Sequence, residues 1–100
     1  MRLIAVGTLA ACWEKHPETR EPLRHWLVIV KSANWTSMNE IQREFPKAKV
    51  LNGDRVRFPI RGGDYRLVVA FDFRRQIAFV KFVGTHAEYD KIDALTVSYR

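Results

Sequence analysis

The stretch that decides the fold is RVRFPIRGGDYRLVVAFDFRRQIAFVKFV, residues 55–83. Much of it alternates apolar and polar residues with a period of two, which is typical of β-strands. The Gly-rich segment 61–64 and the Arg74-Arg75 pair interrupt the alternation and are typical of turns. We therefore expect strands at 55–60, 65–73 and 76–83 in an antiparallel meander. A further short strand is expected just before it, at Val50 to Asn52.

The two turns set the register of this meander. A loop at 61–64 places Ile60 opposite Tyr65, and a two-residue turn at Arg74-Arg75 places Phe73 opposite Gln76. One face is then almost wholly apolar, so helices should cover it. This predicted core face consists of Val56, Phe58, Ile60, Tyr65, Leu67, Val69, Phe71, Ala78, Val80 and Phe82.

The opposite face of the same strands carries basic residues. Arg55, Arg57, Arg66 and Lys81 all point to this side in the predicted register. Arg57 and Lys81 flank the central strand, and Arg66 lies diagonal to both, within reach of long side chains. Arg66 also opposes Val83, so the chain that follows should begin beside it.

That following stretch is GTHAEYDK, residues 84–91. Thr85 and Glu88 have the spacing of a capping box, which predicts the start of a short helix. His86, Tyr89 and Asp90 then stand at i, i+3 and i+4, on one face of that helix. An acid–base group, a phenol and a carboxylate should therefore meet the basic face of the sheet.

The first half of the chain predicts helices. A strand is expected at 2–6, and Thr8 should cap a helix that ends before Pro17. Pro22 suits the start of a second helix, and a capping box at Ser37 predicts a third. Their apolar stripes are typical of core packing. We expect one α+β domain spanning 1–100, a small, mostly antiparallel sheet with N-terminal helices on one face and a short C-terminal helix.

Charge favours an anionic partner. The formal net charge is +6 and the sequence pI is about 9.9, and the segment from Arg43 to Lys81 carries the whole excess. A basic segment of this kind favours RNA or DNA binding. A protein-binding subunit with acidic partners is the alternative.

The sequence gives less support to a disulfide-bonded, metal-binding, secreted or membrane protein. The single cysteine, Cys12, excludes an internal disulfide and leaves no cysteine cluster for zinc. His86 and Asp90 could ligate a metal, but the sequence suggests no third ligand, so we expect neither a metal nor a cofactor. The apolar start is too short for a signal peptide, and no stretch is long enough to span a bilayer. We expect a cytoplasmic protein.

Two segments of the sequence together resemble a known protein family. GGDYRLV at 62–68 and FVGTHAEYD at 82–90 resemble the HigB-type toxins of bacterial type II toxin–antitoxin systems, and WEKHP at 13–17 and ANW at 33–35 extend the likeness. The resemblance implies a RelE-like fold and an mRNA interferase that cleaves mRNA, commonly on the translating ribosome. It also implies a HigA-type helix-turn-helix antitoxin as partner. On the matching positions it implies functional roles for Arg66, His86, Tyr89 and Asp90, with Lys91 adjacent.

Metal-free RNA cleavage requires a base for the 2′-hydroxyl, an acid for the leaving oxygen and cations for the charge on phosphorus. We assign the phosphate to Arg66 and proton transfer to His86, while Tyr89 and Asp90 orient RNA or the imidazole. The remaining cations predicted to bind RNA are Arg55, Arg57, Arg61, Arg74, Arg75, Lys81 and Lys91. The alternative is a non-catalytic module that binds RNA or the ribosome.

Overall fold

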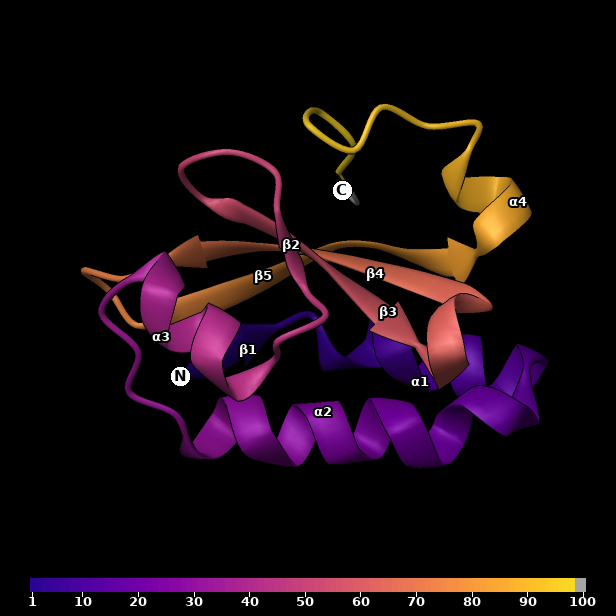
Figure 1. Ribbon diagram of the computed structural model, residues 1–100. Helices are drawn as coiled ribbons and strands as arrows, with labels where there is room; N and C mark the ends of the chain where they lie inside the picture. Colours follow the sequence, from indigo (N-terminus) through magenta and orange to yellow (C-terminus); the bar gives the residue numbers. More distant parts are fainter. Residues whose placement is uncertain (99–100) are drawn as a thin grey trace.

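The computed structural model describes residues 1–98, which form a five-stranded sheet with the order β1-β5-β4-β3-β2 (Figure 1). β1 pairs with β5 in parallel, and the other neighbours are antiparallel. The strands are β1 (Arg2–Ile4), β2 (Lys49–Val50), β3 (Arg55–Ile60), β4 (Tyr65–Asp72) and β5 (Ile77–Thr85). The predicted α+β architecture with a mostly antiparallel sheet is confirmed.

Helices lie on both sides of this sheet. In Figure 1, α1 and α2 run beneath it, whereas α4 and the chain after it lie on the other side, the outer face. The helices are α1 (Val6–Lys15), α2 (Arg20–Ser32), α3 (Met38–Glu44) and α4 (His86–Tyr89), with 3-10 turns at Pro17–Thr19 and Arg61–Gly63.

The cap of α1 and one hydrogen bond of the cap of α3 differ from the expectation. α1 begins at Val6, without a side-chain cap, so the prediction that Thr8 caps it is wrong. α3 begins as predicted, with Ser37 Oγ accepting a hydrogen bond from Glu40 N. The Glu40 carboxylate, however, accepts from Thr36 N and Oγ1, so the reciprocal bond goes one residue further back.

The predicted register is confirmed in the first hairpin and in half of the second. Ile60 pairs with Tyr65, and Val69 pairs with Val80. The second turn is longer than predicted, because Asp72 pairs with Ile77 and residues 73–76 form the turn. Gln76 takes a positive φ of 58° there, so its predicted pairing with Phe73 is wrong.

A β-bulge changes the rest of the second hairpin. Val69 faces Val80 but Val68 faces Phe82, so Lys81 is the extra residue. From there on, Arg66 pairs with Gly84, one residue beyond the predicted Val83. Because side chains alternate between faces, the bulge turns Phe82 away from the helices and Val83 toward the core. The prediction that Phe82 belongs to the core face is therefore wrong.

The main core lies between the sheet and the helices. It contains all residues of the predicted core face except Phe82. Five helix residues join them: Leu9, Leu23, Trp26, Val30 and Ile41. Phe58 is 1% exposed and makes edge-on ring contacts with Trp26 and Phe45. Its truncation to alanine would cost about 3–5 kcal/mol.

The outer face is less open than the sequence suggests. Val68, Ala70 and Phe82 lie on it and are buried. The chain after α4 folds back above this face (Figure 1), and Arg55 Nη1 donates to the carbonyl oxygens of Ala94 and Val97 at 3.0 and 2.7 Å. Arg55 thus anchors the final segment to the sheet.

Candidate functional site

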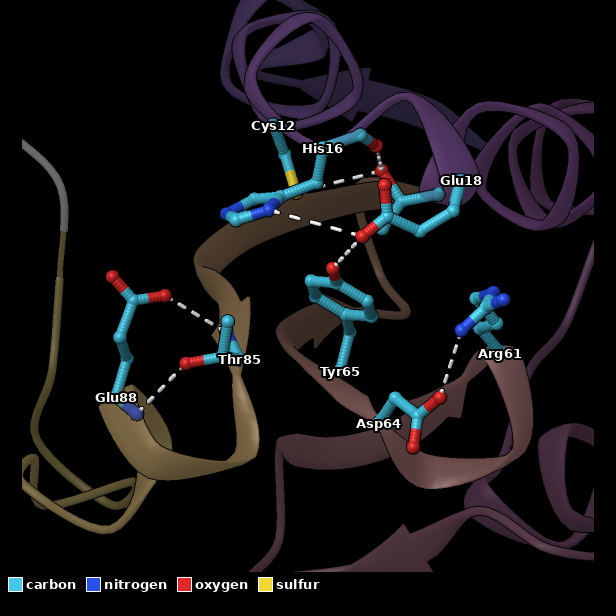
Figure 2. Close-up of polar contacts among 9 residues, drawn as sticks. Cys12, His16, Glu18, Arg61, Asp64, Tyr65, Thr85 and Glu88 are labelled. Carbon is cyan, nitrogen blue, oxygen red and sulfur yellow. Dashed lines mark hydrogen bonds and ion pairs between the residues drawn. The ribbon is translucent and has the colours of Figure 1, made fainter.

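The helix α4 is fixed where β5 ends. Thr85 Oγ1 accepts from Glu88 N at 3.1 Å, and Glu88 Oε1 accepts from Thr85 N at 2.8 Å, the predicted capping box (Figure 2). The hydrogen bond from Thr85 N lowers the pKa of Glu88. His86 N also donates to Asp64 O at 3.0 Å, which ties the helix to the turn before β4. The first residues of α4 are therefore held by three backbone contacts.

Gly84 leaves space for the side chains that pack over the end of β5. A Cβ at this position would lie 2.8 Å from Glu88 Oε1 and 2.9 Å from Phe82 Cζ. Real Cβ atoms do not approach other atoms so closely, so only glycine lets the capping box and the Phe82 ring close over the strand.

Tyr89 joins α4 to the outer face of the sheet. Arg57 Nη1 donates to its hydroxyl at 3.3 Å, and the Cζ atoms of Arg57 and Arg66 each lie 5.6 Å from its ring centroid. The centroid of the Phe82 ring lies 6.1 Å from the centroid of the Tyr89 ring. Two cations and two aromatic rings therefore pack together, because the bulge has turned Phe82 outward.

His86 and Asp90 form an exposed pair at the end of the helix. His86 Nε2 lies 3.6 Å from Asp90 Oδ1, with the side chains 55% and 64% exposed. The predicted i, i+4 proximity is confirmed. Tyr89 differs from the prediction that all three share one face, because it packs onto the sheet while the pair faces solvent.

Arg66 retains unused hydrogen-bonding capacity. Its side chain is half-buried over Tyr89, and its Nε is buried with no partner among residues 1–98. A guanidinium fits two oxygens of a phosphate, and a buried donor without a partner is costly. This cation suits an anionic ligand at the α4 corner, which we define as Arg57, Arg66, His86, Tyr89 and Asp90.

The other predicted cations lie at varied distances from this corner. Lys91 directly follows it and is exposed. Lys81 is the bulge residue, with Nζ 3.4 Å from Ser98 Oγ and 5.3 Å above the Phe79 ring. Arg55 is 9% exposed and holds the final segment, so the structure places it in a structural role.

The turn arginines are not part of the corner. Arg61 pairs with Asp64 at 3.0 Å in the turn before β4. Arg74 and Arg75 lie in the β4–β5 turn, at the end of the hairpin opposite α4, with Arg75 Nε 3.8 Å from Asp72 Oδ2. The structure therefore brings together only part of the predicted set.

A family comparison identifies the chain. The model of the HigB toxin family, described as the RelE-like toxic component of a toxin–antitoxin system, matches residues 19–92. The chain belongs to the HigB toxin family. A protein of Escherichia coli O6:H1 named mRNA interferase HigB is 24% identical to it over 99 residues, covering 92% of this chain and 91% of that protein.

This HigB-family chain has a second polar network that the sequence analysis missed. Tyr65 donates a short hydrogen bond to Glu18 Oε2, which raises the pKa of Tyr65 to about 12 and lowers that of Glu18 (Figure 2). The His16 ring packs 5.2 Å from the Tyr65 ring. Tyr65 pairs with Thr85 and precedes Arg66, so the network braces the α4 corner from the helical side. Nothing local in the sequence signals a contact between residues so far apart.

Among residues 1–98, no group of three or more His, Cys, Asp or Glu side chains could hold a metal ion. Over the same residues, no helix has both the length and the apolar character that crossing a membrane requires.

Proposed function

We propose that this HigB-family toxin is an endoribonuclease that cleaves mRNA in the cytoplasm and thereby stops translation. The α4 corner is the observation that carries the proposal: an exposed imidazole–carboxylate pair flanks Tyr89, whose ring lies against Arg66, a cation with an unpaired Nε. The E. coli relative named as an mRNA interferase supports it. The family's toxin–antitoxin description implies an antitoxin partner, which we propose to be a HigA-type helix-turn-helix protein.

The chemistry is transfer of the phosphodiester from the leaving 5′-oxygen to the neighbouring 2′-oxygen. A base removes the 2′-hydroxyl proton, the 2′-oxygen bonds to phosphorus, and the bond to the 5′-oxygen breaks as an acid protonates it. The products are a 2′,3′-cyclic phosphate and a 5′-hydroxyl. Positioned side chains that transfer such protons contribute about 10²–10⁴-fold in rate.

We assign the roles by exposure and charge. His86 transfers a proton, as base or acid, because it is the exposed imidazole of the corner. Asp90 orients the imidazole. Arg66 binds the scissile phosphate, while the Tyr89 ring contacts both guanidinium groups and holds them in place.

The remaining cations supply affinity for RNA. Arg57 and Lys91 lie next to the reacting phosphate and bind the adjacent phosphates of the RNA. Lys81 lies further along the outer face. Arg74 and Arg75, exposed in the distant turn, suit contact with ribosomal RNA, as does Arg61. Arg55 is left out of this set, because its guanidinium is occupied by the final segment.

Mapping RNA 5′ ends after induced expression tests the proposal. Wild-type protein should stop growth and leave cut transcripts, whereas His86→Ala or Arg66→Ala should not cut. Arg24→Ala, an exposed arginine on α2, is the matched control and should cut normally. With purified components, cleavage should persist in chelator, and a 2′-deoxy substitution at the scissile nucleotide should abolish it.

The alternative is a module that binds RNA or the ribosome without cutting. The stacking of Arg57 and Arg66 on Tyr89 favours it, since such a surface also accepts bases. It predicts translation arrest with intact transcripts. Growth arrest without new 5′ ends would therefore replace the first proposal by this one.

A further inference from the structure

A groove runs between α2, the end of α3 and the β3 edge of the sheet. One hollow of about 280 Å³ and an adjoining one of about 300 Å³ share Glu44, Phe45 and Pro59. A third of about 480 Å³ shares Glu44 and continues along α2 past Val28, which is 62% exposed. We call this the α2–α3 groove; its mainly apolar lining includes Pro22, Trp26, Ile29, Phe45 and Pro59.

One residue of the groove lining has a buried donor without a partner. Trp26 lines it and is 2% exposed, and its Nε1 makes no hydrogen bond to any residue of 1–98. A buried indole N–H normally finds an acceptor, and leaving one unpaired costs about 1–3 kcal/mol. An oxygen supplied by a bound partner would satisfy it.

The neighbouring strand edge shows how such a partner would bind. β2 pairs with β3 only at Val56 and Arg57, so the edge beyond them is open. Arg55 O accepts from Leu51 N on this side, and the backbone of Pro59 faces the same way because strand residues alternate. Proline has no N–H, so this edge does not favour addition of a strand. The groove suits inserted side chains instead.

Charge indicates the chemistry of the partner. From Arg20 to Lys49, basic residues outnumber acidic ones, and His25 and Lys47 line the hollows with Glu44 as their acidic member. A segment with apolar anchors and flanking carboxylates would complement this surface in shape and charge.

We propose that the α2–α3 groove binds the antitoxin, through a segment that inserts apolar side chains beside Trp26 and presents acidic groups to His25 and Lys47. The groove shares no residue with the α4 corner. The proposal rests on membership of a toxin–antitoxin family and not on RNA cleavage. Binding and cleavage should therefore be separable by substitution.

The resemblance to HigB-type toxins implies an antitoxin gene just downstream, so the test uses the toxin and the protein encoded by that gene, the downstream protein. Calorimetry should show that His25→Asp/Lys47→Glu weakens binding at least about tenfold, while toxicity without the downstream protein is unchanged. In cells, co-expression should then fail to rescue growth. The matched control, Ala11→Asp/Lys15→Glu on α1, makes the same charge change outside the groove and should still be neutralised.

Trp26→Phe tests the unpaired donor while keeping an aromatic ring at this position, and urea unfolding measures what the smaller ring costs in stability. The substitution should weaken binding about three- to tenfold, the range expected for one hydrogen bond. Binding by the His25→Asp/Lys47→Glu variant within twofold of wild type would overturn the proposal. So would a loss of self-association in that variant, measured by ultracentrifugation, with antitoxin binding intact. A wild-type protein that binds the downstream protein but cuts no RNA would contradict only the proposed cleavage.

Discussion

Tyr89 offers the sharpest test of how the site is built. Its hydroxyl accepts one hydrogen bond of 3.3 Å from Arg57, whereas its ring contacts two guanidinium groups and Phe82. Tyr89→Phe removes the hydrogen bond alone, a loss of about 1 kcal/mol or about fivefold in rate. Tyr89→Ala also removes two cation–π contacts of about 0.5–1 kcal/mol each and a ring pair of similar size.

We therefore expect the two variants to differ strongly. Tyr89→Phe should cleave RNA within about tenfold of wild type, because the ring still holds Arg66. Tyr89→Ala should lose at least about 100-fold, since small displacements of a group that binds the reacting phosphate cost that much. The assay is single-turnover cleavage of an mRNA, with urea unfolding to confirm that each variant is folded.

One control and two outcomes make the test decisive. Phe73→Ala removes a half-buried ring in the β4–β5 turn, at the end of this hairpin that lies away from α4. It should therefore lower stability and leave cleavage intact. Equal losses in Tyr89→Phe and Tyr89→Ala would show that the hydroxyl transfers a proton. A Tyr89→Ala variant within fivefold of wild type would refute the positioning role.

Three further predictions concern the frame around the corner. Thr85→Ala should cost about 1 kcal/mol and lower cleavage, whereas Ser37→Ala, the equivalent cap on α3, should cost as much in thermal unfolding without affecting cleavage. Gly84→Ala should impair both folding and cleavage because its Cβ meets Glu88 and Phe82, while Gly53→Ala, with nothing within 4 Å, should be neutral in both assays. An ultraviolet titration should show one tyrosine ionising near pH 12, and Glu18→Gln should return it toward its usual value. Because the folded pKa of Tyr65 is raised, the stability that it contributes should be complete below about pH 10 and lost as the pH rises to 12. The lowered pKa of Glu18 has its effect at acidic pH. The stability that Glu18 contributes should be lost as the pH falls and its carboxylate becomes protonated.

The capping box and the hairpins were predictable because local rules control them. Thr85 and Glu88 are three residues apart, the spacing that the reciprocal hydrogen bonds of a capping box require. The alternation of apolar residues from Val56 to Val80 sets which face is buried, since a slip of one residue would turn arginines inward. The sequence alone therefore determined the antiparallel meander, most of its covered face and the proximity of His86 and Asp90 at one short helix.

Three features needed the tertiary structure. The bulge at Lys81 has no local signal, because it depends on how the end of β5 fits against β4, and it decided that Phe82 packs under Tyr89. The burial of Arg55 depends on where the final segment folds. The Glu18–Tyr65 contact joins distant parts of the chain. Short-range hydrogen bonding and strand periodicity placed the acid–base pair, whereas long-range packing decided which cations stand beside it and which hold the fold together.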